Sequence, residues 1–123
     1  MGLFAVTIGV GHLDGGDLVE VSALVDTGAY HTVLPASLLA QLQVRRLAEQ
    51  IFEFADGNEE SLSVGLARIS WQDKEFPCPV IFGAEDKYLM GASTLESLDL
   101  MVDPRRNKLV PFIHPERPYS GGR

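Results

Sequence analysis

The sequence predicts a single all-β domain of the barrel type. Short apolar runs alternate with polar residues, turn signals follow one another at short intervals, and stretches with helical spacing are brief. The 123 residues, 46% of them hydrophobic, suffice for one core and are too few for two ordinary domains. We therefore expect one domain over residues 1–114 and a flexible tail over residues 115–123.

The first third of the chain predicts two strands and a short helix. Phe4 to Val10 forms the first strand, and Gly15-Gly16 supplies a turn. In the second strand, Leu18 to Val25, valine and alanine recur at every second position, which places them on one face. The leucines between Pro35 and Leu42 have helical spacing over a length that allows one or two helical turns.

The middle of the chain predicts three consecutive strands. Strands over Gln50 to Ala55 and Ser61 to Trp71 are joined through Asp56-Gly57-Asn58, which is a strong hairpin signal. A third strand, Lys74 to Phe82, follows a turn at Gln72-Asp73. Two prolines in this strand indicate that part of it lies at an edge or a bulge.

The last third predicts one short helix and a final hairpin. The helix covers Ser93 to Leu98, where Ser93 and Glu96 have the spacing of a capping box. Leu100 to Val102 and Lys108 to Ile113 predict two strands that flank the turn residues between them. No internal repeat is evident, so the chain is expected to contain a single copy of any site it carries.

The most informative stretch is Asp26-Thr27-Gly28-Ala29. It follows the apolar run Val21 to Val25 and leads into Thr32 to Pro35, so a predicted strand delivers an acid to a turn. Glycine allows the backbone to turn tightly, and threonine can hydrogen-bond locally. An apolar setting can tune the proton affinity of the carboxylate.

A second motif follows some sixty residues later, where Leu89-Met90-Gly91 precedes the predicted helix. An apolar pair, a glycine and a helix at this distance from Asp-Thr-Gly-Ala resemble the retropepsin-like aspartic proteases of retroviruses and their bacterial and archaeal relatives. The resemblance covers about residues 4 to 112 and implies a closed barrel with a short C-terminal helix. One departure is Tyr30-His31, where such proteases commonly carry small residues, and it bears on the shape of the pocket beside the turn.

Hydrolysis of a peptide by carboxyl groups requires two of them, which share one proton. Asp14 and Asp56 also precede glycine but lack the hydroxyl residue and the apolar lead-in strand, so one chain supplies one acid. A two-fold homodimer would bring Asp26 together with its symmetry mate. The resemblance implies this homodimer, with Thr27 bridging the two subunits, Gly28 offering backbone to the substrate, and the terminal strands at the interface, Phe4 to Val10 and Lys108 to Ile113.

The resemblance also implies a substrate cleft. Asp56, Gly57 and Asn58 lie about where such proteases carry a flexible flap, although the same residues are compatible with an ordinary exposed hairpin turn. Ala29 and Leu89 are expected to contact an extended peptide substrate. Five apolar residues are candidates for subsite walls or for plain core: Leu34, Ile51, Phe54, Phe82 and Leu89.

Composition argues against several other functions. A net charge of -7 and a pI near 4.8 disfavour nucleic acid and anionic membranes as partners. No run approaches the eighteen apolar residues of a membrane span, and the N-terminal segment has neither a basic leader nor a cleavage site, so we expect a soluble, cytoplasmic protein. His12, His31 and His114 lack ligand spacing, hence no metal or other cofactor is expected. The single cysteine, Cys78, excludes an intramolecular disulfide and is interpreted as a buried structural thiol.

These observations favour an aspartic endopeptidase that is active as a homodimer and uses Asp26 from each chain. The alternative is a dimeric peptide-binding module of the same fold that holds peptides without cutting them. The two differ in whether Asp26 has a partner with which it shares a proton, and in whether cleavage products form.

Overall fold

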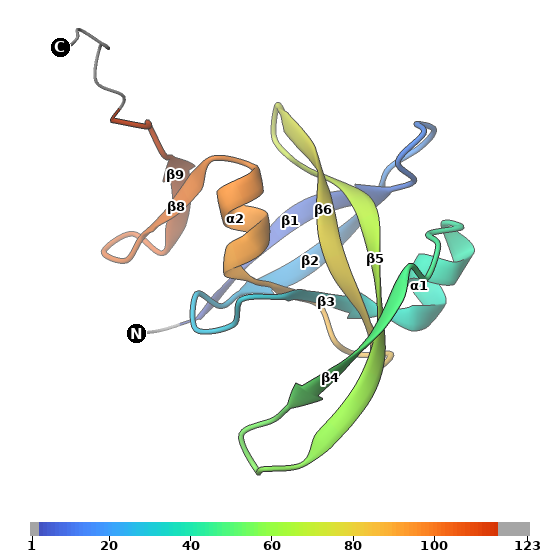
Figure 1. The fold of residues 1–123 in the computed structure, drawn as a ribbon. Helices are drawn as coiled ribbons and strands as arrows, with labels where there is room; N and C mark the ends of the chain where they lie inside the picture. The colour runs from blue at the N-terminus through green and yellow to red at the C-terminus, as the bar shows by residue number, and fades with distance from the viewer. Residues whose placement is uncertain (1–2, 116–123) are drawn as a thin grey trace, which may run out of the picture.

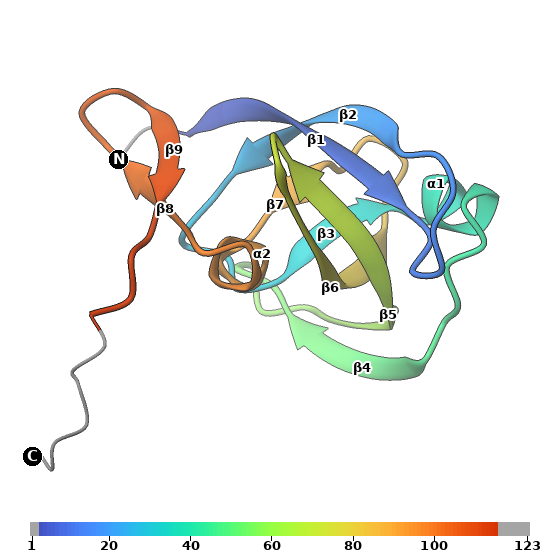
Figure 2. The ribbon, with the colours of Figure 1, turned by 90° about the horizontal axis from the view of Figure 1, so that it is seen from above.

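The computed structural model describes residues 3–115, which form a β-barrel with two short helices. The strands of its main sheet are Phe4–Gly11 (β1), Val19–Val25 (β2), Thr32–Pro35 (β3), Ala48–Glu53 (β4), Glu59–Trp71 (β5), Lys74–Gly83 (β6) and Leu89–Met90 (β7). They are arranged in the order β1-β2-β7-β3-β6-β5-β4, and β5 also pairs with β1. This last pairing closes the sheet into a ring with β4 outside it (Figure 2), so the predicted all-β barrel is confirmed.

The alternating pattern of β2 carries the chain to Asp26. Ala23 and Val25 are buried, whereas Ser22 and Leu24 beside them are exposed. Successive side chains of a strand point to opposite faces, so the predicted apolar face of β2 is turned into the barrel. On this face the side chains become more buried toward Asp26, from the exposed Val19 at the start of the strand to the buried Val25 at its end. The fully buried centre of the barrel contains Ile8, Val10, Leu34, Ile69, Val80 and Met90.

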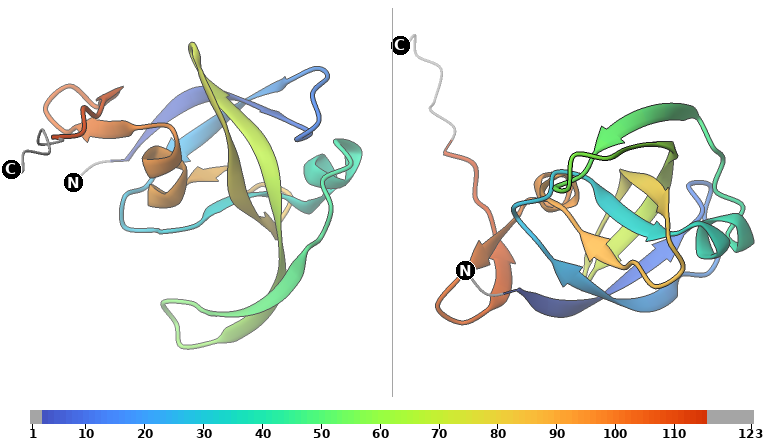
Figure 3. Two further views of the ribbon diagram at one scale, coloured as in Figure 1. Left: turned by 45° about the horizontal axis from the view of Figure 1, so that its top comes forward. Right: turned by 90° about the horizontal axis from the view of Figure 1, so that it is seen from below.

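The two helices are short. The helix predicted between Pro35 and Leu42 is confirmed as α1, Ala36–Gln41. The late helix is confirmed as α2, Ala92–Ser97, which begins one residue earlier than expected. Figure 3 shows the two helices on opposite sides of the barrel.

The capping box predicted for the late helix is wrong. Gly91 occupies the N-cap position, no side chain caps the helix, and Ser93 lies inside its first turn. The first N–H groups of the helix, which no residue of its own can satisfy, instead donate to carbonyl oxygens of the loop that follows Asp26. A tertiary contact therefore replaces the local cap.

The strands β3 and β7 are additional to those predicted. They have four and two residues, too few for an alternating pattern to identify them. β3 lies parallel to β6, and β7 lies parallel to β2 and antiparallel to β3. These pairings join segments that are distant in the sequence and place β7 directly beside the end of β2, the strand that leads to Asp26.

The predicted C-terminal hairpin is confirmed as β8, Leu100–Asp103, paired with β9, Lys108–Pro111. It forms a two-stranded sheet of its own beside α2, separate from the main sheet (Figure 1). The predicted tail over residues 115–123 lies outside the described residues, except for Pro115. Across residues 3–115, none of the helices has the length and apolar character that spanning a bilayer would require.

Candidate active site

The loop that follows β2, residues 26–31, is called the Asp26 loop here. The N–H of Asp26 donates to the carbonyl oxygen of Met90 at 3.0 Å, and the N–H of Ala29 donates back to the carbonyl oxygen of Asp26 at 3.2 Å. The N–H of Gly28 donates to Oδ1 of the Asp26 side chain at 2.9 Å. The loop thus forms a tight turn that orients its own carboxylate, which is half-buried, while Thr27 and Gly28 are exposed.

Glycine at position 28 suits this turn. A Cβ atom there would lie 3.2 Å from Oδ1 of Asp26, the atom that accepts the hydrogen bond of Gly28. A larger residue at position 28 would therefore crowd the Asp26 carboxylate. Glycine avoids this contact, so the carboxylate keeps its hydrogen bond to the N–H of Gly28.

The first turn of α2 is hydrogen-bonded to the backbone of the Asp26 loop. The N–H of Ala92 donates to the carbonyl oxygen of Ala29, and the N–H of Ser93 donates to that of Tyr30, each at 2.8 Å. Gly91 allows this close approach, because a Cβ atom there would lie 2.4 Å from the carbonyl oxygen of His31. Two backbones meet here without an intervening side chain.

Gly91→Ala should therefore displace the Asp26 loop from α2. We expect the free energy of unfolding to fall by about 1–3 kcal/mol, the usual cost of forcing an extra methyl group into a packed region. We also expect a loss of any Asp26-dependent activity at temperatures where the variant is folded. Urea unfolding and activity assays on the same preparation measure the two effects.

A matched control for Gly91→Ala is Gly15→Ala. Gly15 has a φ of +112° with no atoms near its would-be Cβ, so alanine there strains the backbone without a clash at the Asp26 loop. This control should lower stability and leave activity unchanged. Full activity of Gly91→Ala would show that the close approach at Gly91 does not position Asp26.

The β4–β5 hairpin lies next to the Asp26 loop. Its turn matches the predicted one: Gly57 has a φ of +87°, and the Asp56 carboxylate accepts hydrogen bonds from the backbone and the side chain of Asn58. All three turn residues are exposed. The hairpin extends beyond the barrel, with its tip on the side of the Asp26 loop (Figures 1 and 2).

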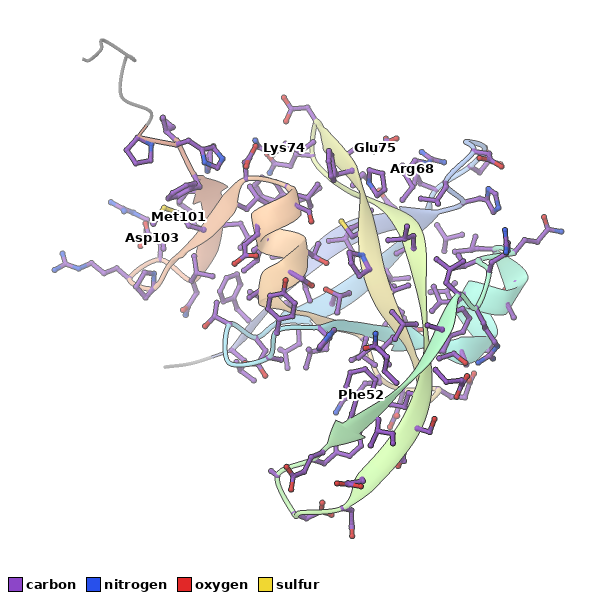
Figure 4. The ribbon with its side chains drawn as sticks, in the orientation of Figure 1. Phe52, Arg68, Lys74, Glu75, Met101 and Asp103 are labelled. Carbon is purple, nitrogen blue, oxygen red and sulfur yellow. The ribbon has the colours of Figure 1, made fainter. Side chains whose placement is uncertain are left out.

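Aromatic contacts join this hairpin to the Asp26 loop. Phe52 of β4, labelled in Figure 4, packs edge to face on His31 with ring centroids 5.2 Å apart. His31 packs in the same manner on Tyr30, at 5.1 Å. At Tyr30-His31, where the sequence departs from the small residues common in retropepsin-like proteases, His31 thus contacts the hairpin and Tyr30 packs on His31.

The base of the hairpin is fastened by a polar cluster. The guanidinium of Arg46 lies over the ring of Phe82, 4.4 Å from its centroid, and donates to Oγ of Ser63 at 2.8 Å. The hydroxyls of Ser63 and Ser61 donate to the Glu49 carboxylate and hold the pKa of Glu49 below its ordinary value. The hairpin therefore has an anchored base and an exposed tip.

The structure separates the candidate subsite residues. Leu34 and Phe82 are buried, so they belong to the core, which was the alternative reading for them. Ile51 and Phe54 are exposed on the hairpin and its turn. Leu89 is half-buried in β7, next to β2 and β3. The structure thus places Asp26, Thr27, Gly28 and Ala29 in one loop, with Leu89 beside Leu24 at the end of the strand that leads to it, and sets Asp56, Gly57 and Asn58 at the tip of the adjacent hairpin.

Cys78, expected to be a buried structural thiol, is buried. Its burial raises the pKa of the thiol to about 11, against a smaller opposing effect of the Ser97 and Thr94 hydroxyls. In residues 3–115, no three histidine, cysteine or acidic side chains come together as a metal site would require.

A hollow of about 340 Å³ lies at the end of β2 opposite Asp26, away from the site described above, and is lined by Thr7, Leu18 and Glu20 among others.

Sequence reasoning missed the buried threonines beneath the loop. Thr32 and Thr94 hydrogen-bond to each other through their hydroxyls, and both are fully buried. A threonine at the start of the apolar run Thr32 to Pro35 is the signal that could have drawn attention to this position.

A family model described as gag-polyprotein putative aspartyl protease matches residues 15–97. The match includes the Asp26 loop, the β4–β5 hairpin, β7 and α2. The search of curated proteins finds no match to the chain. Since the matched residues make up more than half of the sequence and the fold is the barrel that the resemblance implied, the chain belongs to the retropepsin-like aspartyl protease family.

Proposed function

We propose that this protein is an aspartic endopeptidase that acts as a homodimer, with one Asp26 from each subunit at a shared active site. The observation that carries the proposal is the Asp26 carboxylate at the end of β2, oriented by the N–H of Gly28 and backed by β7 and α2. Family membership supports the reaction class.

The chemistry requires both carboxyl groups. One is ionised and accepts a proton from the attacking water, while the other is protonated and polarises the carbonyl of the peptide bond. The Gly28 N–H engages Oδ1 of Asp26. Oδ2, for which the described residues provide no hydrogen-bond donor, remains for the water and for the carboxyl of the second subunit. Thr27, exposed beside Asp26, is proposed to bridge the subunits.

The β8–β9 hairpin is the proposed centre of the dimer interface. Met101, Phe112 and Ile113 on and after this hairpin are exposed to 46%, 40% and 85%. Figure 4 labels Met101, and Figure 1 shows the hairpin on the same side of the barrel as the Asp26 loop. A second copy that covers these apolar side chains would also bring its own Asp26 loop toward the first.

The other expected interface strand is β1. It pairs with β2 over residues 4–10 but with β5 only over Gly9 to Gly11, so the edge over residues 4–8 has no strand beside it. We propose that this edge contributes to the same interface, since an open strand edge is a ready site for pairing with another chain.

The β4–β5 hairpin is the proposed flap. An extended peptide would lie between it and the Asp26 loop as an additional β-strand. Ala29 and Leu89 would contact the peptide on the side of the Asp26 loop, and Asp56, Gly57 and Asn58 would close over it from the side of the hairpin. Closure would exclude water from the reacting groups. The contact of Phe52 with His31 joins the proposed flap to the Asp26 loop.

Incubation of the purified protein with a random peptide library over pH 3 to 8, followed by mass spectrometry, tests the proposal. We expect new termini within the peptides, which mark endopeptidase cleavage. Peptides that are retained on the protein without new termini would support the non-catalytic binding module instead.

A further inference from the structure

Three backbone hydrogen bonds fasten the Asp26 loop to residues 90–93. They run from the N–H of Asp26 to the oxygen of Met90, from the N–H of Ala92 to the oxygen of Ala29, and from the N–H of Ser93 to the oxygen of Tyr30. Their lengths are 3.0, 2.8 and 2.8 Å. The position of Asp26 therefore depends on where residues 90–93 lie.

A side chain in turn holds this segment at its centre. The N–H of Gly91 donates to Oγ1 of Thr32 at 3.0 Å. Thr32 follows directly after the Asp26 loop, at the first position of β3, and its hydroxyl also bonds to that of Thr94 in α2. Thr32 and Thr94 have no exposed surface, and Gly91 is buried as well.

The hydroxyl of Thr32 thus links the start of β3 to Gly91 and to α2. It accepts the N–H of Gly91 and shares a second hydrogen bond with the Thr94 hydroxyl, so the segment that bonds to the Asp26 loop is tied to the residue that directly follows this loop. Valine would fill the same space without the hydroxyl. It would leave the N–H of Gly91 buried without its partner, which is costly enough to drive residues 90–93 toward a different position.

We propose that Thr32 is a positioning residue for Asp26, acting through Gly91 and residues 90–93. This inference rests on the proposed function, because it assigns Thr32 a role in the reaction carried by Asp26. A displacement of about 1 Å at a reacting group can reduce a rate by about a hundredfold, so a small shift of this segment is sufficient to matter.

The kinetic test compares Thr32→Val with Thr32→Ser. We expect Thr32→Val to lower kcat by about 10- to 100-fold with KM within about twofold of wild type. Thr32→Ser retains the hydroxyl and should keep kcat within about threefold. Measurements are made at protein concentrations where sedimentation shows each variant to be dimeric, so a change in assembly is not read as a change in kcat.

Leu39→Ala is the control for lost stability. Leu39 is fully buried in α1, on the opposite side of the barrel from α2 (Figure 3), and its truncation should destabilise the fold without altering kcat. If Thr32→Val loses stability to a similar degree and keeps the kcat of wild type, its hydroxyl is structural and the proposal is overturned.

Amide hydrogen exchange provides a test that needs no activity. In Thr32→Val the amides of Asp26, Ala92 and Ser93 should exchange at least about tenfold faster than in Leu39→Ala, because the segment that pairs with the loop is no longer held. Thr94→Val should change the same amides in the same direction, and it serves as the test if Thr32→Val does not fold. Unchanged exchange at these amides would overturn the positioning role, whereas absence of cleavage by wild type with faster exchange in the variant would count against the proposed function alone.

Discussion

Asp26→Asn should abolish peptide cleavage and leave the fold and the dimer intact. The substitution is nearly isosteric, and the side-chain oxygen of asparagine can still accept the N–H of Gly28 that now meets Oδ1 of Asp26. What is lost is the ability to share and transfer a proton. Cleavage of a defined peptide, measured alongside thermal unfolding and sedimentation, separates the loss of chemistry from a loss of structure.

Asp17→Asn is the matched control for this experiment. Asp17 is an exposed acid between β1 and β2, so the same change of charge occurs away from the Asp26 loop. The control should cleave as wild type does. Hydrolysis by Asp26→Asn within tenfold of wild type, roughly 1.4 kcal/mol of barrier, would refute the assignment of Asp26.

Specific activity should fall on dilution, in proportion to the fraction of chains that are dimeric. Each chain has one Asp-Thr-Gly turn, so a lone subunit offers one carboxyl group where the reaction needs two. Activity per chain measured over a dilution series, together with sedimentation under the same conditions, should give one common midpoint.

Mixing experiments test the same dependence without dilution. Excess Asp26→Asn should suppress the activity of wild type, because mass action converts wild-type dimers into heterodimers that carry a single competent acid. The double variant Asp26→Asn/Met101→Lys is the comparison: a charge at the exposed apolar position 101 of β8 should weaken pairing with wild type, so an excess of this variant should suppress less. A monomer that keeps its full specific activity on dilution would contradict both the dimer and the use of one acid from each chain.

The sequence was sufficient to predict those features whose causes are local. The alternation of β2, the turn at Asp26-Thr27-Gly28 and the hairpin turn at Gly57 each depend on residues within a few positions of one another. The barrel class followed from the succession of such elements, and the structure confirms it. Element ends were less accurate: β4 spans Ala48–Glu53 and not residues 50–55, because its turn already begins at Phe54, whose N–H bonds to Asn58.

The tertiary structure decided how the Asp26 loop is supported. Ser93 and Glu96 have capping-box spacing, yet carbonyl oxygens from residues 29 and 30 satisfy the start of α2. Likewise, Leu34 and Phe82 could have lined a cleft or filled a core, and only the closure of the barrel made them core. In each case the local pattern allowed two outcomes, and a partner distant in the sequence selected one of them.

By itself, then, the sequence determined that an acid stands in a glycine turn at the end of a buried strand, and that each chain supplies one such turn. The contact of Thr32 with Gly91 and Thr94, across about sixty residues, was decided by the fold. A hydroxyl and a backbone N–H leave no periodic pattern in a sequence. They become partners only when burial removes the water that would otherwise satisfy them.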